Sequence, residues 1–176
     1  MLFGNPDTSA NSRSPLVRVD SECFTADLCD SLQCECGPQR AEAIRLCREE
    51  GRGVIIYMRD EGRGIGLYAK LDAYQLQIDE GLDTFQANEA LGFPADARNF
   101  TTAADMLKDL GITTVRLLTN NPAKIEALVT AGITIEEVLP TGTYVTREDR
   151  RYLETKIRGT THLLELDDGY RLAEGV

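Results

Sequence analysis

The sequence predicts an α/β fold with a mixed, partly parallel sheet and flanking helices. Short apolar runs of strand type alternate along the chain with longer segments whose apolar residues recur at helical spacing. The length of 176 residues fits a single compact domain with a buried core. We expect that domain at residues 15–166, a flexible polar N-terminal tail at residues 1–14 and a C-terminal tail at residues 167–176.

The first half of the chain begins with a strand at residues 15–19 that leads into a cysteine-rich loop. A helix follows at residues 39–50, because Ala43, Ile44 and Cys47 recur at helical spacing. Glycine after this helix ends it, and the apolar run at residues 54–58 predicts a second strand. Residues 70–77 are expected to form the next helix.

The second half continues the alternation. Helices are expected at residues 84–91 and 101–110, followed by a strand at residues 114–118. A helix over residues 122–130 has Pro122 in its first turn, where proline is well tolerated. A strand at residues 133–139 completes the predicted sheet.

Three cysteines, Cys23, Cys34 and Cys36, are the most concentrated group of chemically active residues. Cys34 and Cys36 put two sulfurs on one short loop, and Cys23 arrives from the preceding element. Thiolates favour zinc over the hard cations magnesium and calcium. A catalytic zinc takes three protein ligands and leaves one position open, so this spacing predicts an open zinc site.

Other uses of the cysteines stay open at this point. Cys29 as a fourth ligand would make the zinc site structural. A disulfide framework is disfavoured, because the chain has five cysteines and its start has no apolar signal segment. Cys29 and Cys47 have apolar neighbours and are expected to be core or bystander thiols rather than ligands.

A glycine-rich segment, Arg59-Asp-Glu-Gly-Arg-Gly-Ile-Gly-Leu67, directly follows the second predicted strand. Glycines let the backbone approach a ligand closely, and Glu61 and Arg63 add charged hydrogen-bonding groups. The spacing is neither that of a Walker loop nor that of a dinucleotide fingerprint. We interpret it as a ligand-binding loop.

Charge and hydropathy exclude several classes of partner. A net charge of −10 disfavours a nucleic-acid surface, which would show a clustered basic stripe. No apolar run is long enough to cross a membrane, so we expect no membrane association and a cytoplasmic location. The acidic balance still allows a nucleotide to bind, because a few placed arginines and lysines hold phosphates locally.

Several motifs in a fixed order now point to a known family. They are R-V-D-S-E-C, C-E-C-G-P-Q, E-G-R-G-I-G-L, L-D-A-Y, L-G-F-P-A-D-A-R-N-F, L-L-T-N-N-P-A-K and R-R-Y-L-E-T-K. On these motifs the chain resembles GTP cyclohydrolase II of riboflavin biosynthesis over residues 15–166. The resemblance implies conversion of GTP to formate, pyrophosphate and 2,5-diamino-6-(5-phosphoribosylamino)pyrimidin-4(3H)-one, with one zinc per chain, magnesium on the triphosphate and a homodimer.

The resemblance also assigns roles to residues. It implies zinc ligation by Cys23, Cys34 and Cys36, and catalytic roles for Arg98 as the nucleophile toward the α-phosphate, Asp96 as its proton acceptor and Tyr74 as a helper in ring opening. The implied nucleotide-binding positions are Arg18, Val19, Asp20, Ser21, Glu22, Gln39, Glu61, Gly62, Arg63, Thr84, Thr119 and Lys124.

The implied chemistry suits these residue types. Opening an imidazole ring needs a strong water nucleophile, which a zinc ion supplies at neutral pH. Guanine offers an N1–H and an amino group as donors, which the Glu61 carboxylate can accept, and Arg63 and Lys124 can neutralise phosphate oxygens. The alternative is a non-catalytic or regulatory GTP-binding homologue that keeps the zinc for stability.

Two positions beside the predicted zinc ligands depart from the family pattern. Asp20 stands where the family typically has histidine, and Gln33 stands where it typically has arginine. The family also has a strand-rich segment before the first motif, whereas only the predicted tail precedes residue 15 here. We expect the two substitutions to place extra negative charge next to the thiolates.

Overall fold

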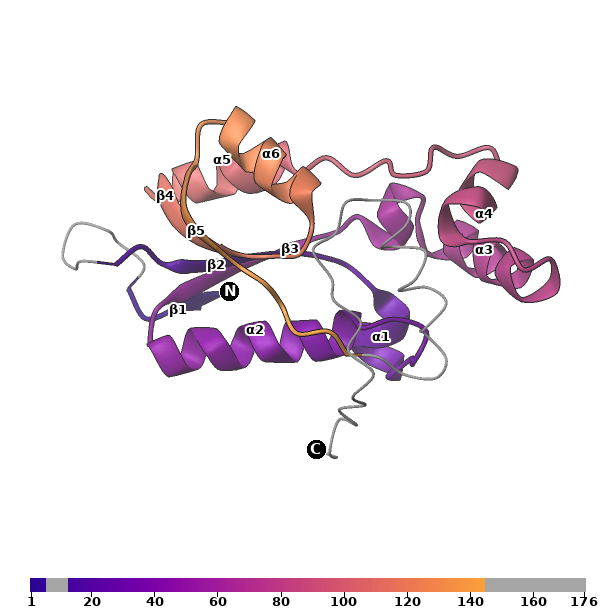
Figure 1. Ribbon diagram of the computed structural model, residues 1–176, viewed down its shortest axis with the longest axis horizontal. Coiled ribbons are helices and arrows are strands. Elements are labelled where there is room, and N and C mark those ends of the chain that lie inside the picture. Colours follow the sequence, from indigo (N-terminus) through magenta and orange to yellow (C-terminus); the bar gives the residue numbers. More distant parts are fainter. Residues whose placement is uncertain (6–12, 145–176) are drawn as a thin grey trace.

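The fold is a mixed sheet with helices on both faces, described here by a computed structural model for residues 1–5 and 13–144. The sheet order is β1-β3-β2-β4-β5 (Figure 1). The strands are β1 (Leu2–Phe3), β2 (Leu16–Ser21), β3 (Gly53–Met58), β4 (Thr114–Leu118) and β5 (Thr134–Leu139). Strand β1 pairs antiparallel with β3, and all other neighbours are parallel, which confirms the predicted α/β class.

The helices form a layer on each face and an extension at one end. They are α1 (Phe24–Cys29), α2 (Cys36–Glu50), α3 (Leu67–Asp79), α4 (Thr84–Ala90), α5 (Thr101–Asp109) and α6 (Pro122–Thr130), with a 3-10 turn, η2, at Glu61–Gly64. Helix α2 covers one face of the sheet, α5 and α6 cover the other, and α3 and α4 extend from one end (Figure 1). The described part of the chain contains no helix long and apolar enough to cross a membrane.

Strand alternation divides the core between the two faces. Leu16 and Ile55 pack with Ala43 and Cys47 of α2. The opposite face is a larger cluster, made of Val17, Val19, Val54, Ile56, Phe100, Ala103, Ala104, Leu107, Ile112, Val115, Leu117, Leu128 and Ile133. Helices α2, α5 and α6 are therefore held to the sheet by apolar burial on both sides.

The start of the chain differs from the expected flexible tail. Leu2 and Phe3 form β1 and pair with Val54 and Gly53. The amino group of Met1 donates a hydrogen bond to the Ile55 carbonyl at 2.7 Å. A strand of two residues is too short to show alternating apolar and polar side chains, so the sequence does not reveal it. Backbone pairing with β3 holds it in the sheet. The predicted end of the domain at residue 166 and the tail at residues 167–176 lie outside the described residues.

Helix α1 and the first turn of α2 were also not predicted. Phe24 and Leu28 of α1 are 40% and 73% exposed, so its apolar residues do not mark a buried face. Helix α2 begins at Cys36, ahead of the predicted start at residue 39, and its first turn contains Gly37 and Pro38. Proline is tolerated in a first helical turn because the amide that it lacks has no intrahelical partner there.

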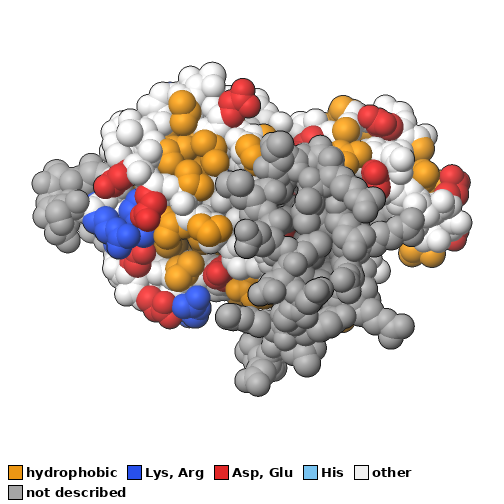
Figure 2. Space-filling view, in the orientation of Figure 1, with side chains coloured by type: hydrophobic (Ala, Val, Ile, Leu, Met, Phe, Trp, Pro, Cys, Tyr) orange, Lys and Arg blue, Asp and Glu red, His pale blue; other side chains and the backbone are white. Residues whose placement is uncertain are grey.

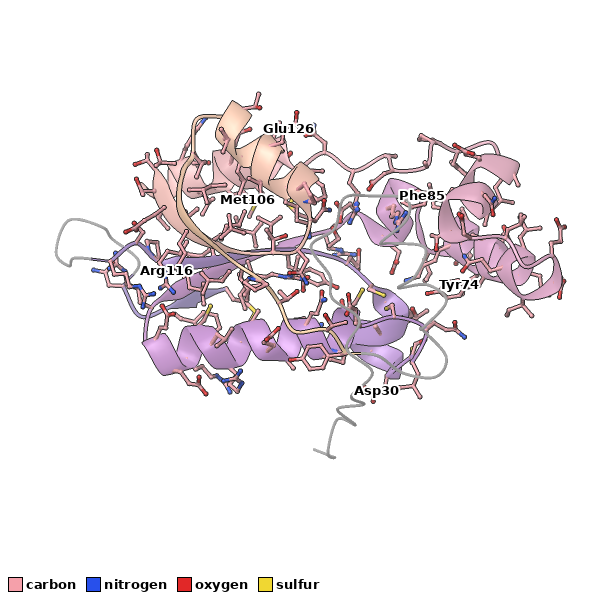
Figure 3. The ribbon with its side chains drawn as sticks, in the orientation of Figure 1. Asp30, Tyr74, Phe85, Met106, Arg116 and Glu126 are labelled. Carbon is pink, nitrogen blue, oxygen red and sulfur yellow. The ribbon has the colours of Figure 1, made fainter. Side chains whose placement is uncertain are left out.

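One charged side chain is enclosed between the sheet and α2. Arg116 of β4 is 2% exposed and lies at the end of the sheet away from α3 and α4 (Figure 3). Its guanidinium donates to both carboxylate oxygens of Glu50 at 2.7 and 3.0 Å and to Glu137 at 2.9 Å. This contact ties the end of α2 to β4 and β5.

We expect Arg116→Met to destabilise the fold by about 1–3 kcal/mol, because it leaves two carboxylates without their shared donor. Urea unfolding followed by circular dichroism measures the loss. The matched control is Arg45→Met, which breaks an exposed pair with Glu49 at 2.8 Å within α2. Equal midpoints for Arg116→Met and Arg45→Met would contradict a stabilising role for the enclosed contact.

Candidate active site

A large pocket lies beyond the carboxyl ends of β2, β3 and β4. Parallel strands end at the same edge of a sheet, and ligands of open α/β sheets bind at that edge. The pocket brings together all the predicted site residues except Val19: Arg18, Asp20, Ser21, Glu22, Cys23, Cys34, Cys36, Gln39, Glu61, Gly62, Arg63, Tyr74, Thr84, Asp96, Arg98, Thr119 and Lys124. The Val19 side chain is in the core, but its carbonyl accepts a hydrogen bond from Lys124 Nζ at 2.8 Å.

The sulfur atoms of Cys23, Cys34 and Cys36 all lie within 4.8 Å of one another. Cys23 precedes α1, and Cys34 and Cys36 flank the start of α2, so two helix starts position the three sulfurs. Hydrogen bonds from Cys34 and Cys36 lower the pKa of Cys23, and the charge of Lys70 lowers it further. Cys29 is exposed and outside this cluster, and Cys47 is a core residue, as expected for a thiol with apolar neighbours.

Asp27 of α1 holds the cysteine loop in place. Its carboxylate accepts from the Cys23 amide at 3.1 Å and from the Tyr57 hydroxyl at 2.6 Å, and it pairs with Arg40 at 3.2 Å. The Asp27 side chain is 4% exposed, so these bonds are shielded from water. The backbone around Cys23 is thereby fixed to both β3 and α2.

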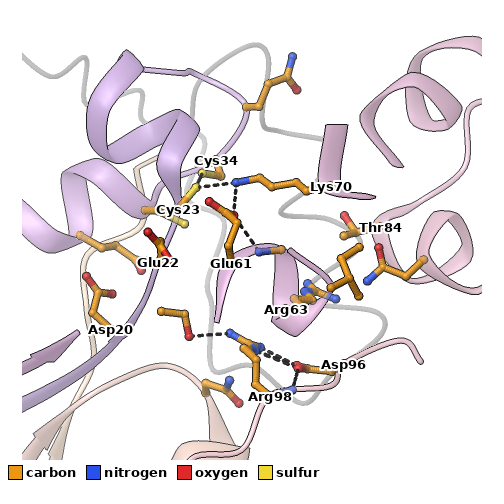
Figure 4. Close-up of a pocket in the computed structure, with 18 of the residues that line it drawn as sticks. Asp20, Glu22, Cys23, Cys34, Glu61, Arg63, Lys70, Thr84, Asp96 and Arg98 are labelled. Carbon is orange, nitrogen blue, oxygen red and sulfur yellow. Dashed lines mark hydrogen bonds and ion pairs between the residues drawn. The ribbon is translucent and has the colours of Figure 1, made fainter. Parts of the chain in front are cut away.

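Glu61 and Lys70 lie directly beside the sulfurs (Figure 4). Lys70 Nζ donates to Glu61 Oε1 at 2.7 Å and to Cys23 Sγ at 3.2 Å. Glu61 also accepts from the amides of Gly62 and Phe24. Lys70 was not among the predicted site residues, although its spacing of four residues from Tyr74 places both on one face of α3.

Tyr74 reaches the same region from α3 (Figure 3). Its hydroxyl lies 3.5 Å from Thr25 Oγ1, which in turn lies 3.7 Å from Cys23 Sγ. Burial raises the pKa of Tyr74 to about 12, so the phenol keeps its proton at neutral pH. Tyr74 is therefore a hydrogen-bond donor close to the cysteines.

The glycine-rich segment has an unusual backbone and supports the next loop. Gly62 and Arg63 both have φ near +60°, at 63° and 61°, a conformation that is strained for arginine. The Arg63 carbonyl accepts from the Ala97 amide at 2.9 Å, and a Cβ on Gly64 would lie only 3.1 Å from the Ala97 carbonyl carbon. Gly64 thus lets the loop containing Asp96 and Arg98 pack closely. The Arg63 guanidinium lies over the Phe85 ring at 4.1 Å.

Asp96 and Arg98 form a bidentate ion pair at the pocket rim (Figure 4). Arg98 Nη2 lies 2.6 Å and Nε 2.9 Å from the two carboxylate oxygens, and Nη1 donates to Ser21 at 3.3 Å. Burial opposes ionisation of Asp96, but the hydrogen bond and charge of Arg98 outweigh it and lower the Asp96 pKa. The Arg98 side chain is only 14% exposed, so the pair is not an ordinary surface contact.

Asp20 does not add an uncompensated charge, contrary to the expectation from the sequence. Its carboxylate accepts from Arg18 Nε and Nη2 at 3.3 and 3.1 Å, and both side chains are buried. Arg18 also donates to Gln39 Oε1 at 3.1 Å. The negative charge of Asp20 is therefore balanced by an arginine of the same strand, two residues before it.

Asp60 is a second residue, after Lys70, that was not among those predicted for the site. Both of its side-chain oxygens are enclosed. Burial raises the pKa of Asp60 above its ordinary value, and the nearby Ser21 hydroxyl and the charges of Arg98 and Lys124 offset only part of this. Asp60 immediately precedes Glu61, so its position in the glycine-rich segment was the available signal.

A mixed α/β sheet with three convergent thiols and three ion pairs at the carboxyl edge of its parallel strands defines a class of protein suited to a metal ion and a phosphorylated ligand. The family model of GTP cyclohydrolase II matches residues 1–140. The chain therefore belongs to the GTP cyclohydrolase II family.

Named relatives agree with this assignment. The chain is 50% identical over 164 residues to GTP cyclohydrolase-2 of Psychromonas ingrahamii, covering 93% of this chain and 80% of the relative. It is 53% identical over 149 residues to GTP cyclohydrolase-2 of Actinobacillus succinogenes, covering 85% and 68%. It is also 53% identical over 151 residues to the riboflavin biosynthesis protein RibBA of Bacillus cytotoxicus, covering 86% of this chain and 38% of that longer protein.

The raised pKa of Asp60 predicts a pH-dependent effect of Asp60→Asn. A carboxyl group whose folded pKa is raised opposes folding once it ionises, so its cost is absent at low pH and grows as the pH rises. Asp60→Asn should therefore gain stability relative to the wild type as the pH rises from 3.5 to 7. Urea unfolding at both pH values measures the difference.

The matched control is Asp72→Asn on α3, which removes one carboxylate from an exposed position. A gain at pH 3.5 as large as that at pH 7 would contradict this account.

Proposed function

We propose that this protein is a zinc-dependent hydrolase that opens the imidazole ring of GTP and releases formate and pyrophosphate. The product is 2,5-diamino-6-(5-phosphoribosylamino)pyrimidin-4(3H)-one, a precursor in riboflavin biosynthesis. The observation that carries the proposal is the presence of the cysteine cluster and the Asp96–Arg98 pair in one pocket. The cysteine cluster suits chemistry on the guanine base, and the Asp96–Arg98 pair suits chemistry on the phosphates.

The cysteine cluster fits a zinc ion. Zinc–sulfur bonds of about 2.3 Å in a tetrahedral site place sulfurs roughly 3.8 Å apart. Here Cys23 Sγ and Cys34 Sγ are 3.6 Å apart, and Cys36 Sγ lies within 4.8 Å of both. A zinc ion held there supplies an activated water nucleophile, and three protein ligands leave it a free position.

Arg98 and Asp96 act on the triphosphate. A guanidinium nitrogen of Arg98 attacks the α-phosphorus, the bond to the bridging oxygen breaks, and pyrophosphate leaves with that oxygen. The lowered pKa of Asp96 keeps it ionised, and it accepts the proton that the attacking nitrogen loses. Arg63 and Lys124 offset phosphate charge, and a magnesium ion bound with the triphosphate would neutralise more of it.

Tyr74 and Glu61 serve the base. The protonated phenol of Tyr74 donates a hydrogen bond to an oxygen or nitrogen at the reacting carbon. The Glu61 carboxylate accepts from donors on the guanine edge, which an adenine edge would not offer in the same pattern. The remaining positions, Thr84 and Thr119 among them, complete the nucleotide site as the resemblance implies.

The protein acts as a homodimer in the cytoplasm, with no nucleic acid or membrane partner. Edge strand β5 and helix α6 expose Val138 and Val129, at 39% and 53%, and hydrophobic side chains gather over this side of the molecule in Figure 2. Such a surface suits contact between subunits.

A non-catalytic GTP-binding homologue is the second candidate, and one contact favours it. Asp20 engages Arg18 in a buried pair, which reduces the positive charge that this wall presents to a nucleotide. Mass analysis after incubation of the protein with GTP and magnesium separates the two candidates. Formate and the diaminopyrimidine indicate the enzyme, whereas unchanged bound GTP indicates the binding homologue.

We expect about one zinc per chain, and expect Cys36→Ser to lose it. A hydroxyl is a much poorer zinc ligand than a thiolate, and two remaining sulfurs hold the ion weakly. Elemental analysis after gel filtration measures the content. Cys29→Ser is the matched control, because Cys29 is exposed and outside the cluster, and it should keep its zinc. Loss of zinc from Cys29→Ser would reject the three-ligand site.

The two half-reactions should separate by mutation. Cys34→Ser should still release pyrophosphate from GTP but little formate, because Arg98 and Asp96 are left in place. Tyr74→Phe should slow formate release more than pyrophosphate release, by roughly tenfold or more for a lost acid–base helper. Coupled assays of both products measure the ratio. If Cys34→Ser loses both products while circular dichroism shows a folded protein, the phosphate and base chemistries are not separable.

A further inference from the structure

Lys70 is a buried cation that contacts both the cysteine cluster and Glu61. It is 8% exposed, and its ammonium donates to Cys23 Sγ at 3.2 Å and to Glu61 Oε1 at 2.7 Å. Figure 4 shows Lys70 reaching from α3 between the cysteines and Glu61. A lysine is rarely buried this deeply without anionic partners, and here it has two.

The surroundings of Lys70 leave it little freedom to move. A Cβ on Gly62 would lie 3.0 Å from the Lys70 Cβ, so the glycine-rich segment packs against the base of its side chain. Its backbone amide donates to the Gly66 carbonyl at 3.0 Å in the first turn of α3. The position of the ammonium is therefore set by both the helix and the glycine-rich segment.

Within the described residues, Lys70 is the one side chain that donates a hydrogen bond to the Glu61 carboxylate. Its other two donors are the backbone amides of Gly62 and Phe24. Phe24 follows Cys23 directly, so the Glu61 carboxylate is bound to the cysteine segment through this amide as well as through Lys70. Oxygen Oε1 accepts from both Lys70 and Gly62, which fixes the plane of the carboxylate.

We propose that Lys70 is a positioning residue that joins the metal-binding and nucleotide-binding ends of the pocket. By donating to Cys23 Sγ, it makes this sulfur a weaker donor to the metal than the other two cysteines. By donating to Glu61, it fixes the carboxylate that accepts from the base. Hydrogen bonds from outside the ligand set commonly tune a metal site in this way. This inference rests on the proposed function, since it assigns Lys70 to the same metal and nucleotide sites.

The first measurement uses cobalt(II) in place of zinc and requires no turnover. A sulfur that loses a hydrogen bond is more electron-rich, so its sulfur-to-cobalt charge-transfer band moves to lower energy. Lys70→Met should show this shift, and Lys70→Arg should restore much of the wild-type position. Lys124→Met is the matched control, because Lys124 is also a buried pocket lysine but donates to the Val19 carbonyl. It should keep the wild-type band.

The second measurement is the affinity of the cobalt-loaded protein for the α,β-methylene analogue of GTP, by calorimetry. Loss of a hydrogen bond to a charged group should weaken binding roughly tenfold in Lys70→Met. Glu61→Gln should weaken it similarly while leaving the cobalt band near its wild-type position. The double variant should lose little more than either single variant, because both act on the same contact.

The outcomes separate this inference from the proposed function. A normal wild-type cobalt band together with an unchanged band in Lys70→Met overturns the inference and leaves the metal site standing. Additive losses of affinity in the double variant likewise overturn the link between Lys70 and Glu61. No cobalt band in the wild type would reject the metal site itself, and the inference with it. Should Lys70→Met fail to fold, the neutral and polar Lys70→Gln variant takes its place, with the same expected shift of the band and the same decision if the band does not move.

Discussion

The parallel register of β2 with β3 and β4 is the constraint on which the pocket depends. Val17 lies opposite Val54 and Ser21 opposite Met58, and the Glu22 amide extends the pairing to the Met58 carbonyl at 2.8 Å. This register delivers the cysteine segment, the glycine-rich segment and the threonine after β4 to one edge. A shift by one residue would turn Arg18 and Asp20 into the apolar face under α5 and α6.

Most charged side chains of the pocket form close ion pairs, so the pocket does not carry a block of charge of one sign. Arg18 faces Asp20, Lys70 faces Glu61, and Arg98 faces Asp96. An acidic chain thereby keeps several cations in a small enclosed volume without strong mutual repulsion. Each pair also fixes the direction of its guanidinium or ammonium group, which favours recognition of an anionic ligand by geometry as well as by charge.

Regular elements could be predicted from the sequence where burial leaves a periodic pattern. Thr114–Leu118 and Pro122–Thr130 match their predicted bounds. After Thr114 the strand is a continuous buried run, and the buried Lys124 and Leu128 of the helix lie about one turn apart. Helix α1 leaves no such pattern, since Phe24 and Leu28 are exposed. The contact between Lys70 and Cys23 depends on how α3 packs against the cysteine loop, and nothing in the local sequence encodes that. The other pocket residues could be predicted from the family motifs, because those motifs reflect tertiary contacts that the periodicity of apolar residues does not.

The three sulfurs all come from residues 23–36, whereas Lys70 and Glu61 come from later in the chain. Closing a short loop costs less conformational entropy than closing a long one. The thiol cluster therefore needs only one short loop to close before its three sulfurs can meet. Thr119 and Lys124 reach the pocket only when β4 joins β2. The loop that carries the thiols can therefore close before the pocket wall that follows β4 is in place.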